Sequence, residues 1–283
     1  MIRRLAQPGP VNPQRIESFA TTLRPIRYAL QPGRTLNDAL AAPLVAAGFR
    51  SATLRFTGGV LSPFRYVMPG PPDGPSHAAY FSAPRAPDGE VRIEQANATF
   101  GFAGDGAPLI HCHAAWTEPT GAIRGGHILP NETIVADPAP VEAGGAVEAW
   151  GSLDVTIAAA PDAETNFPLL QPAGGTESGP GVIARVRPNE DIVVAVETVA
   201  RLHGLRDAVV RGSLGSLVGA CFTSGTEVPG DATEVLVTEG LVRDGTAMLD
   251  LLVVDSEGNV HRGTMERGRN AVCITFDLVL EPI

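Results

Sequence analysis

Three histidines in the middle of the chain have the residue type and spacing of a metal site. His111 and His113 flank Cys112, and His127 follows two glycines. On a β-strand, side chains two residues apart point to the same face, so His111 and His113 point the same way. The segment 117–121, Thr-Glu-Pro-Thr-Gly, is typical of a turn between two strands. We therefore expect the first two histidines and the third on neighbouring strands of a hairpin.

The length of the hairpin loop decides whether the third histidine joins the other two. With a loop of three or five residues, we expect residues whose numbers sum to 238 to lie opposite each other. His127 is then across from His111 and diagonal to His113, and all three imidazoles share one face. A loop of four residues would turn His127 to the other face.

Three imidazoles on one face predict a transition-metal site. Neutral imidazole nitrogens suit zinc, and three of them leave a fourth coordination position open. At that position a metal acidifies bound water or polarises a bound carbonyl group. The pattern predicts zinc, or another divalent transition metal, on His111, His113 and His127; the alternative is three unrelated histidines on a half-buried hairpin. Cys112 faces the opposite side of the strand and is not expected to be a ligand.

Catalysis at such a metal would also need an acid or a base. Glu94 is the first candidate for a catalytic carboxylate, because it lies on a predicted strand just before the histidine strand. The alternative is that Glu94 is a surface residue of that strand. Glu234 holds the matching place in the second half of the chain.

Hydrophobic periodicity predicts an α+β architecture. Leu36, Leu40 and Leu44 recur at helical spacing within 35–47, and Gly48 ends the run; a similar pattern covers 191–203. We expect strands at 25–30, 52–57, 91–102, 108–116, 122–128, 146–160, 182–187, 207–213, 233–242, 246–254, 259–265 and 271–280. Residues 68–76 are expected to form a loop.

Two parts of the chain repeat. Residues 31–55 resemble 187–211 at an offset of 156, and 120–127 resemble 257–264 at an offset of 137. We therefore expect two tandem copies of a domain with a mainly antiparallel β-sheet and one main helix. The expected boundaries are an N-terminal arm at 1–23 without regular structure, a first domain at 24–172, a linker at 173–180 and a second domain at 181–283. The second copy has lost the trio, since Met248, Asp250 and Thr264 stand at the matching positions.

Several of these segments resemble one known domain family. The run 208–217, the acidic turn 255–260 and the two histidine motifs together resemble the PPC domain, which is conserved in plants and prokaryotes. The resemblance runs from about Pro25 to the C-terminus. It implies trimeric assembly of single-domain members, zinc on the three histidines, and a fold similar to that of acetolactate decarboxylase.

Composition argues against nucleic acids and membranes as partners. The net charge is −10, and the chain has 21 arginines, no lysine and no Arg-Gly-Arg-Pro hook, so direct DNA binding is not expected. No apolar run approaches 18 residues, so we expect no membrane span. The start of the chain lacks the apolar core of a secretion signal, and the three cysteines are far apart. Both features favour a cytoplasmic protein with reduced thiols.

These observations predict a zinc protein that binds a small molecule or an anion at the open metal position. Two alternatives remain: a metal-dependent lyase acting on a small oxo-acid, and a DNA-associated regulator, which is the role commonly given to the PPC family. Because single-domain relatives form trimers, we expect a homo-oligomer, with a trimer favoured over a dimer.

Overall fold

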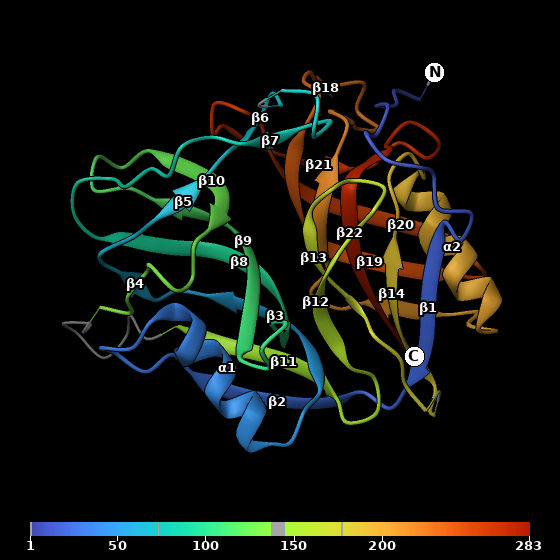
Figure 1. Cartoon of the computed structure of the whole chain (residues 1–283), viewed down its shortest axis with the longest axis horizontal. Coiled ribbons are helices and arrows are strands. Elements are labelled where there is room, and N and C mark those ends of the chain that lie inside the picture. The colour runs from blue at the N-terminus through green and yellow to red at the C-terminus, as the bar shows by residue number, and fades with distance from the viewer. Residues whose placement is uncertain (1, 73, 137–144, 177) are drawn as a thin grey trace.

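The computed structural model describes residues 2–72, 74–136, 145–176 and 178–283, and it contains two large β-sheets and two helices. Figure 1 shows the sheet of the first half and the sheet of the second half beside each other, with one helix at the periphery of each. The strands pair almost entirely antiparallel. The sheet-rich α+β class expected from the sequence is therefore confirmed.

The first sheet has ten strands. Its main path runs β2 (Arg24–Ala29), β11 (Ala146–Ser152), β3 (Ser51–Thr57), β8 (Val91–Phe102), β9 (Pro108–Thr117), β10 (Ile123–Ile128) and β5 (Tyr66–Val67). Attached beside this path are β4 (Val60–Leu61), β12 (Ile157–Pro161) and β13 (Pro168–Pro172). A separate two-stranded ribbon joins β6 (Pro69–Gly70) to β7 (Tyr80–Phe81).

The second sheet has eight strands. Its main path runs β1 (Ile16–Thr21), β14 (Gly181–Val186), β22 (Val272–Pro282), β15 (Ala208–Val210), β19 (Thr233–Arg243), β20 (Thr246–Val254) and β21 (Val260–Thr264). The eighth strand, β16 (Leu214–Leu217), pairs with β19 and β22, and a two-stranded ribbon joins β17 (Ala220–Cys221) to β18 (Glu227–Val228).

Each half contains one helix that begins at a capping side chain. In α1 (Leu36–Ala46), the Thr35 hydroxyl accepts a hydrogen bond from a free backbone N–H of the first turn. In α2 (Ile192–Leu202), the Asp191 carboxylate does the same. Gly48 and Gly204 follow the helices in the left-handed conformation that glycine adopts most readily. The helices predicted at 35–47 and 191–203 are confirmed to within one residue at each end.

The main paths of the two sheets follow the same plan. The order β2-β11-β3-β8-β9-β10 in the first sheet has the counterpart β14-β22-β15-β19-β20-β21 in the second. The register also corresponds: His113 pairs with His127 in the first half, and Asp250 pairs with Thr264 in the second, each 137 residues later.

The expectation of an arm without regular structure was wrong for residues 16–21. These residues form β1, which pairs antiparallel with β14, so Ile16 lies opposite Val186 and Thr21 opposite Gly181. The physical reason is that β14 would otherwise be an edge strand with unpaired backbone groups. The prolines at 8, 10 and 13 lie before β1, in the irregular part of the arm.

Two strand predictions, and the loop predicted at 68–76, which contains β6, need smaller corrections. The segment expected as one strand at 146–160 is divided into β11 and β12. The strand expected at 207–213 ends at Val210, because Gly212 and Ser213 have positive φ angles of 54° and 61°, and β16 follows. The stretch 168–172, not predicted as a strand, is β13. The described residues of the predicted 173–180 linker are irregular, and residue 177 lies outside the described residues.

Neither helix in the described part of the chain is long and apolar enough to cross a membrane, since each has 11 residues.

The two halves pack directly against each other. Leu214, Leu236, Leu252 and Val254 of the second half belong to the same apolar core as the first-half sheet. The fully buried side chain of Asn97 on β8 donates to backbone carbonyl oxygens of the second half, at 2.9 Å from Ser213 and 2.8 Å from Val237. The faces of β8 and β9 that meet the second half are therefore held by both apolar and polar contacts.

A buried network of ion pairs also joins the two halves, between the end of β12 and β14. Asp162, which follows β12, accepts from Nη2 of Arg185 on β14 at 2.8 Å and from Nη1 of Arg187, just after β14, at 3.0 Å. Arg187 also pairs with Glu17 of β1. Burial alone would raise the pKa of Asp162, but the two guanidinium groups outweigh it and hold that pKa below its usual 3.8.

We predict that Asp162→Asn lowers the free energy of unfolding at pH 7 by about 3 kcal/mol, because it leaves two buried guanidinium groups without their shared carboxylate. A carboxylate whose pKa is lowered by folding stabilises the protein above its unfolded pKa, and this contribution is lost as the pH falls through the folded pKa. In urea denaturation, the difference in unfolding free energy between the variant and wild type should therefore decrease as the pH falls below the usual pKa of 3.8.

The matched control is Asp244→Asn, which removes the carboxylate of an ion pair whose side chains are 79% (Arg206) and 73% (Asp244) exposed. Exposed pairs contribute at most about 1 kcal/mol, so this change should be small. Equal losses in the two variants would contradict a structural role for the buried network.

Candidate metal centre

The three histidines lie on adjacent strands and share one face of the first sheet. His127 on β10 is directly opposite His113 on β9 and diagonal to His111. The expected register was wrong by two residues along the strand, since the numbers of paired residues add up to 240 rather than 238. The loop between the strands is 118–122, closed by a hydrogen bond from Glu118 N to Ala122 O. Because the shift is an even number of residues, His127 still points to the same face of the sheet as His111 and His113.

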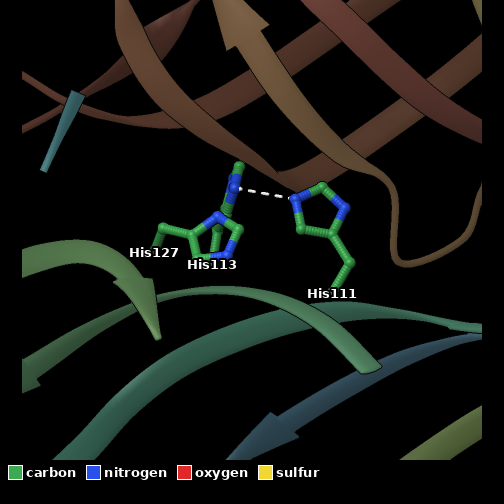
Figure 2. A group of neighbouring side chains, drawn as sticks. All are labelled: His111, His113 and His127. Atoms are coloured by element: carbon green, nitrogen blue, oxygen red, sulfur yellow. Dashed lines mark hydrogen bonds between the residues drawn. The ribbon is translucent and has the colours of Figure 1, made fainter. Parts of the chain in front are cut away.

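The rings converge on a common point. Ring centroids are 4.7 Å apart for His111 and His113, 5.1 Å for His111 and His127, and 5.2 Å for His113 and His127. One ring nitrogen from each residue lies within 4.8 Å of those of the other two. Figure 2 shows the rings standing between the strands of the first half and those of the second, with the two Nε2 atoms of His111 and His113 joined at 3.1 Å.

Acceptors from the second half hold the outer nitrogens of two rings. Nδ1 of His113 lies 3.1 Å from the backbone oxygen of Val235, and Nδ1 of His111 lies 3.3 Å from Oδ2 of Asp277. A hydrogen on each Nδ1 would satisfy these contacts and leave each Nε2 able to bind a metal ion. This is the tautomer that partners beyond the ligands commonly impose on metal-binding histidines.

The environments of two rings shift their pKa values in opposite directions. Burial lowers the pKa of His127 well below its usual 6.5, and the neighbouring His111 and His113 lower it further. Burial also disfavours the charged form of His113, but the Glu234 carboxylate and the Val235 carbonyl outweigh burial and raise its pKa. His127 is thus held as a neutral ring, the form in which imidazole binds a metal.

A carboxylate from the second half approaches the same point. Oε2 of Glu234, on β19, lies 3.0 Å from Nε2 of His113, and the Glu234 residue is only 4% exposed. Asp277, on β22, accepts from Thr99 at 2.8 Å in addition to its contact with His111. Sequence reasoning named Glu234 only as a counterpart of Glu94, and it missed Asp277 because neither residue is near the histidines in the chain.

The structure does not bring Glu94 to the histidines. Its side chain is exposed and accepts a hydrogen bond from Thr117 at the far end of β9. Glu94 lies in a bulge of β8, three residues before Asn97, the residue that pairs with His113. At about 3.3 Å per residue, three residues separate it from the trio by roughly 10 Å along the strand.

The two glycines before His127 allow β10 to lie close to β5 of the same sheet and to the second half of the chain. A Cβ on Gly125 would meet the side chains of Val254 and Val260 from the second half, and a Cβ on Gly126 would meet Val67 O at 2.9 Å. Of these two glycines, only Gly125 shares the face of His127, and the second half leaves no room for a side chain there. The Gly-Gly-His sequence therefore reflects packing as well as chemistry.

The positions that match the trio in the second half have other contacts. Met248 is 47% exposed, and Thr264 donates a hydrogen bond to Asp250 across the β20–β21 pair. Cys112 is fully buried on the opposite face of β9 from the histidines, and burial raises the pKa of its thiol. The trio is the one cluster of metal-ligand type found among the residues that the structure describes.

A cavity of about 340 Å³ opens beside the trio. All three histidines and Glu234 line it, together with apolar side chains from both halves. A ligand in this cavity would therefore have direct access to the converging ring nitrogens.

Comparison with known proteins shows a family model that resembles part of the chain. The model of the Plants and Prokaryotes Conserved (PCC) domain matches residues 17–146. A solved metal-containing protein from Archaeoglobus fulgidus is 15% identical, with a TM-score of 0.41, and the alignment covers 54% of this chain and 96% of that one. A plant- and prokaryote-conserved protein from Pyrococcus horikoshii is 15% identical, with a TM-score of 0.40 and coverage of 53% and 96%. A candidate DNA-binding protein from Ralstonia eutropha is 18% identical, with a TM-score of 0.38 and coverage of 51% and 88%. A search of curated proteins gave no match.

We predict that Gly125→Ala lowers the free energy of unfolding by about 1–3 kcal/mol, because the new methyl group overlaps Val254 and Val260. Gly104→Ala is the matched control, since its Cβ would meet nothing within 4 Å. Denaturant titration of both variants measures the difference. A tolerated Gly125→Ala would contradict the close approach of β10 to the second half.

Proposed function

From the match of residues 17–146 to the model of the PCC domain, we propose that this protein holds one zinc ion, or another divalent transition metal, on His111, His113 and His127 and binds a small molecule at the open position. One observation carries the proposal: three ring nitrogens converge within 4.8 Å while two of the outer nitrogens are held by acceptors.

The residues present fit such an ion. Nδ1 of His127 is buried and has no hydrogen-bond partner among the described residues, which is a costly state for a polar atom unless a ligand or an ion meets the ring. The Nε2 atoms of His111 and His113 lie 3.1 Å apart, close to the separation of two ligands on one tetrahedral ion. A set of neutral imidazoles suits zinc better than magnesium or calcium, which prefer oxygen ligands.

Glu234 gives the centre a second kind of group. Its carboxylate lies beside the ligand nitrogen of His113, so it can act as a fourth ligand or accept a proton from a group bound at the open position. When bound, the metal would supply Lewis acidity at that position. This placement also favours the second candidate, a metal-dependent lyase, because such an enzyme needs an acid or a base next to the metal.

We also infer that the two halves are tandem copies of one domain, of which only the first keeps the histidines. The shared strand order and the shared register at an offset of 137 residues support this inference. In this arrangement the second copy contributes Glu234, Asp277 and the Val235 carbonyl to the site of the first.

We predict about one metal ion per chain in protein purified without chelator, measured by elemental mass spectrometry. His127→Ala should abolish this metal while leaving the fold intact, because His127 Nδ1 makes no hydrogen bond that the fold needs. His261→Ala is the matched control, since His261 contacts Asp255 outside the trio. Metal-free wild type after incubation with zinc, or equal metal in both variants, would refute the proposal.

Glu234→Gln should weaken metal binding about 10–100-fold, the range measured when groups that support metal ligands are changed. Competition with a chelator of known affinity measures the effect. Glu94→Gln is the control with the same chemical change on an exposed side chain, and it should leave the affinity unaltered. If both variants bind zinc like wild type, Glu234 takes no part in the centre.

A further inference from the structure

We infer that the ligand of this centre is a small neutral molecule with an aromatic or branched aliphatic body and one uncharged metal-binding head, rather than an oxo-acid or another small anion. The inference rests on the proposed metal centre and deepens it. Two properties of the cavity carry it: the composition of its walls and the absence of a cation among its described lining residues.

Aromatic rings form the wall that leads to the histidines. The Phe81 ring lies 5.0 Å from the His127 ring, and Phe167 lies 6.0 Å from Phe81. Tyr80 stacks on Phe167 at 5.6 Å and is 39% exposed, so it stands at the open end of this wall. An aryl or alkyl group in the cavity would continue this row of rings.

Aliphatic side chains complete the enclosure. Leu109, Leu169 and Leu170 come from the first half and Ile274 comes from the second, so both halves contribute apolar surface. A cavity of about 340 Å³ falls near the lower end of the usual range for small-molecule sites, which are mostly apolar with a few polar groups to orient the ligand. Burial of the ligand's body against these walls would supply most of the affinity.

The charge of the cavity disfavours an anionic head. Glu234 is the carboxylate among the described lining residues, and none of those residues is an arginine. Arg185 is a cation behind the wall, and its Nε donates to Thr275, a lining residue, at 3.3 Å. Its charge is already matched by Asp162 at 2.8 Å, so it offers little to a ligand. A divalent ion on the trio would already be balanced by the carboxylates of Glu234 and Asp277, which contact His113 and His111, so a carboxylate ligand would bring a third negative charge without a compensating cation.

The test uses the full chain loaded with zinc and three probes, each titrated by calorimetry: 4-phenylimidazole, imidazole and pyruvate. We expect 4-phenylimidazole to bind at least about tenfold more tightly than imidazole, because its ring is buried against the apolar walls. Pyruvate should bind most weakly. Equal affinity for the two azoles, or tightest binding of pyruvate, would overturn the inference and leave the metal centre standing. Protein that takes up no zinc would overturn the proposed function and this inference together.

Two variants test the contribution of the apolar walls and the effect of the Glu234 carboxylate separately. Tyr80→Ala should reduce the preference for 4-phenylimidazole over imidazole severalfold, whereas Leu202→Ala, on the exposed face of α2, should leave that preference unchanged. Glu234→Gln, compared at full zinc occupancy, should strengthen pyruvate binding relative to imidazole. If pyruvate gains nothing from Glu234→Gln, the charge argument is wrong, and if Tyr80→Ala keeps the full preference, the apolar wall does not select the ligand.

Discussion

The polar face of β8 and β9 is buried against the second half of the chain, and each polar group on it needs a partner there. An unpaired buried donor or acceptor destabilises a protein by about 1–3 kcal/mol. Asn97 meets the carbonyls of Ser213 and Val237, Thr99 meets Asp277, and His113 meets Val235. These contacts set the alignment of the two halves. The site is consequently built from both halves, although its three imidazoles come from the first.

The same burial shapes the chemistry of the centre. Two carboxylates, Glu234 and Asp277, lie beside imidazoles that are mostly removed from water. Buried negative charge is unfavourable without a positive partner, and a divalent ion between the rings would provide one. The ring of His127, whose pKa is lowered by burial and by its two neighbours, stays available as a neutral ligand. A metal therefore fits the charges of the site as well as its nitrogens.

Local patterns in the sequence predicted the elements and the shared face of the histidines. The first helix followed from the helical spacing of its leucines before Gly48, the second followed from a similar pattern, and the parity of the hairpin followed from its turn. Long-range packing was not encoded locally. β1 became a strand because β14 has an open edge, and Glu234 reached His113 because β19 crosses β9 from 121 residues further along the chain. Glu94 was the nearer carboxylate in sequence, but its strand position turns it to solvent.

The central claim is that one metal ion sits between the three rings, with Glu234 next to it. Anomalous diffraction from a crystal of the protein grown without chelator, recorded on both sides of the zinc absorption edge, tests this most directly. The account predicts one strong zinc peak about 2.0–2.1 Å from a nitrogen of each of His111, His113 and His127. A zinc peak elsewhere, or rings that close on one another with no peak between them, would contradict it.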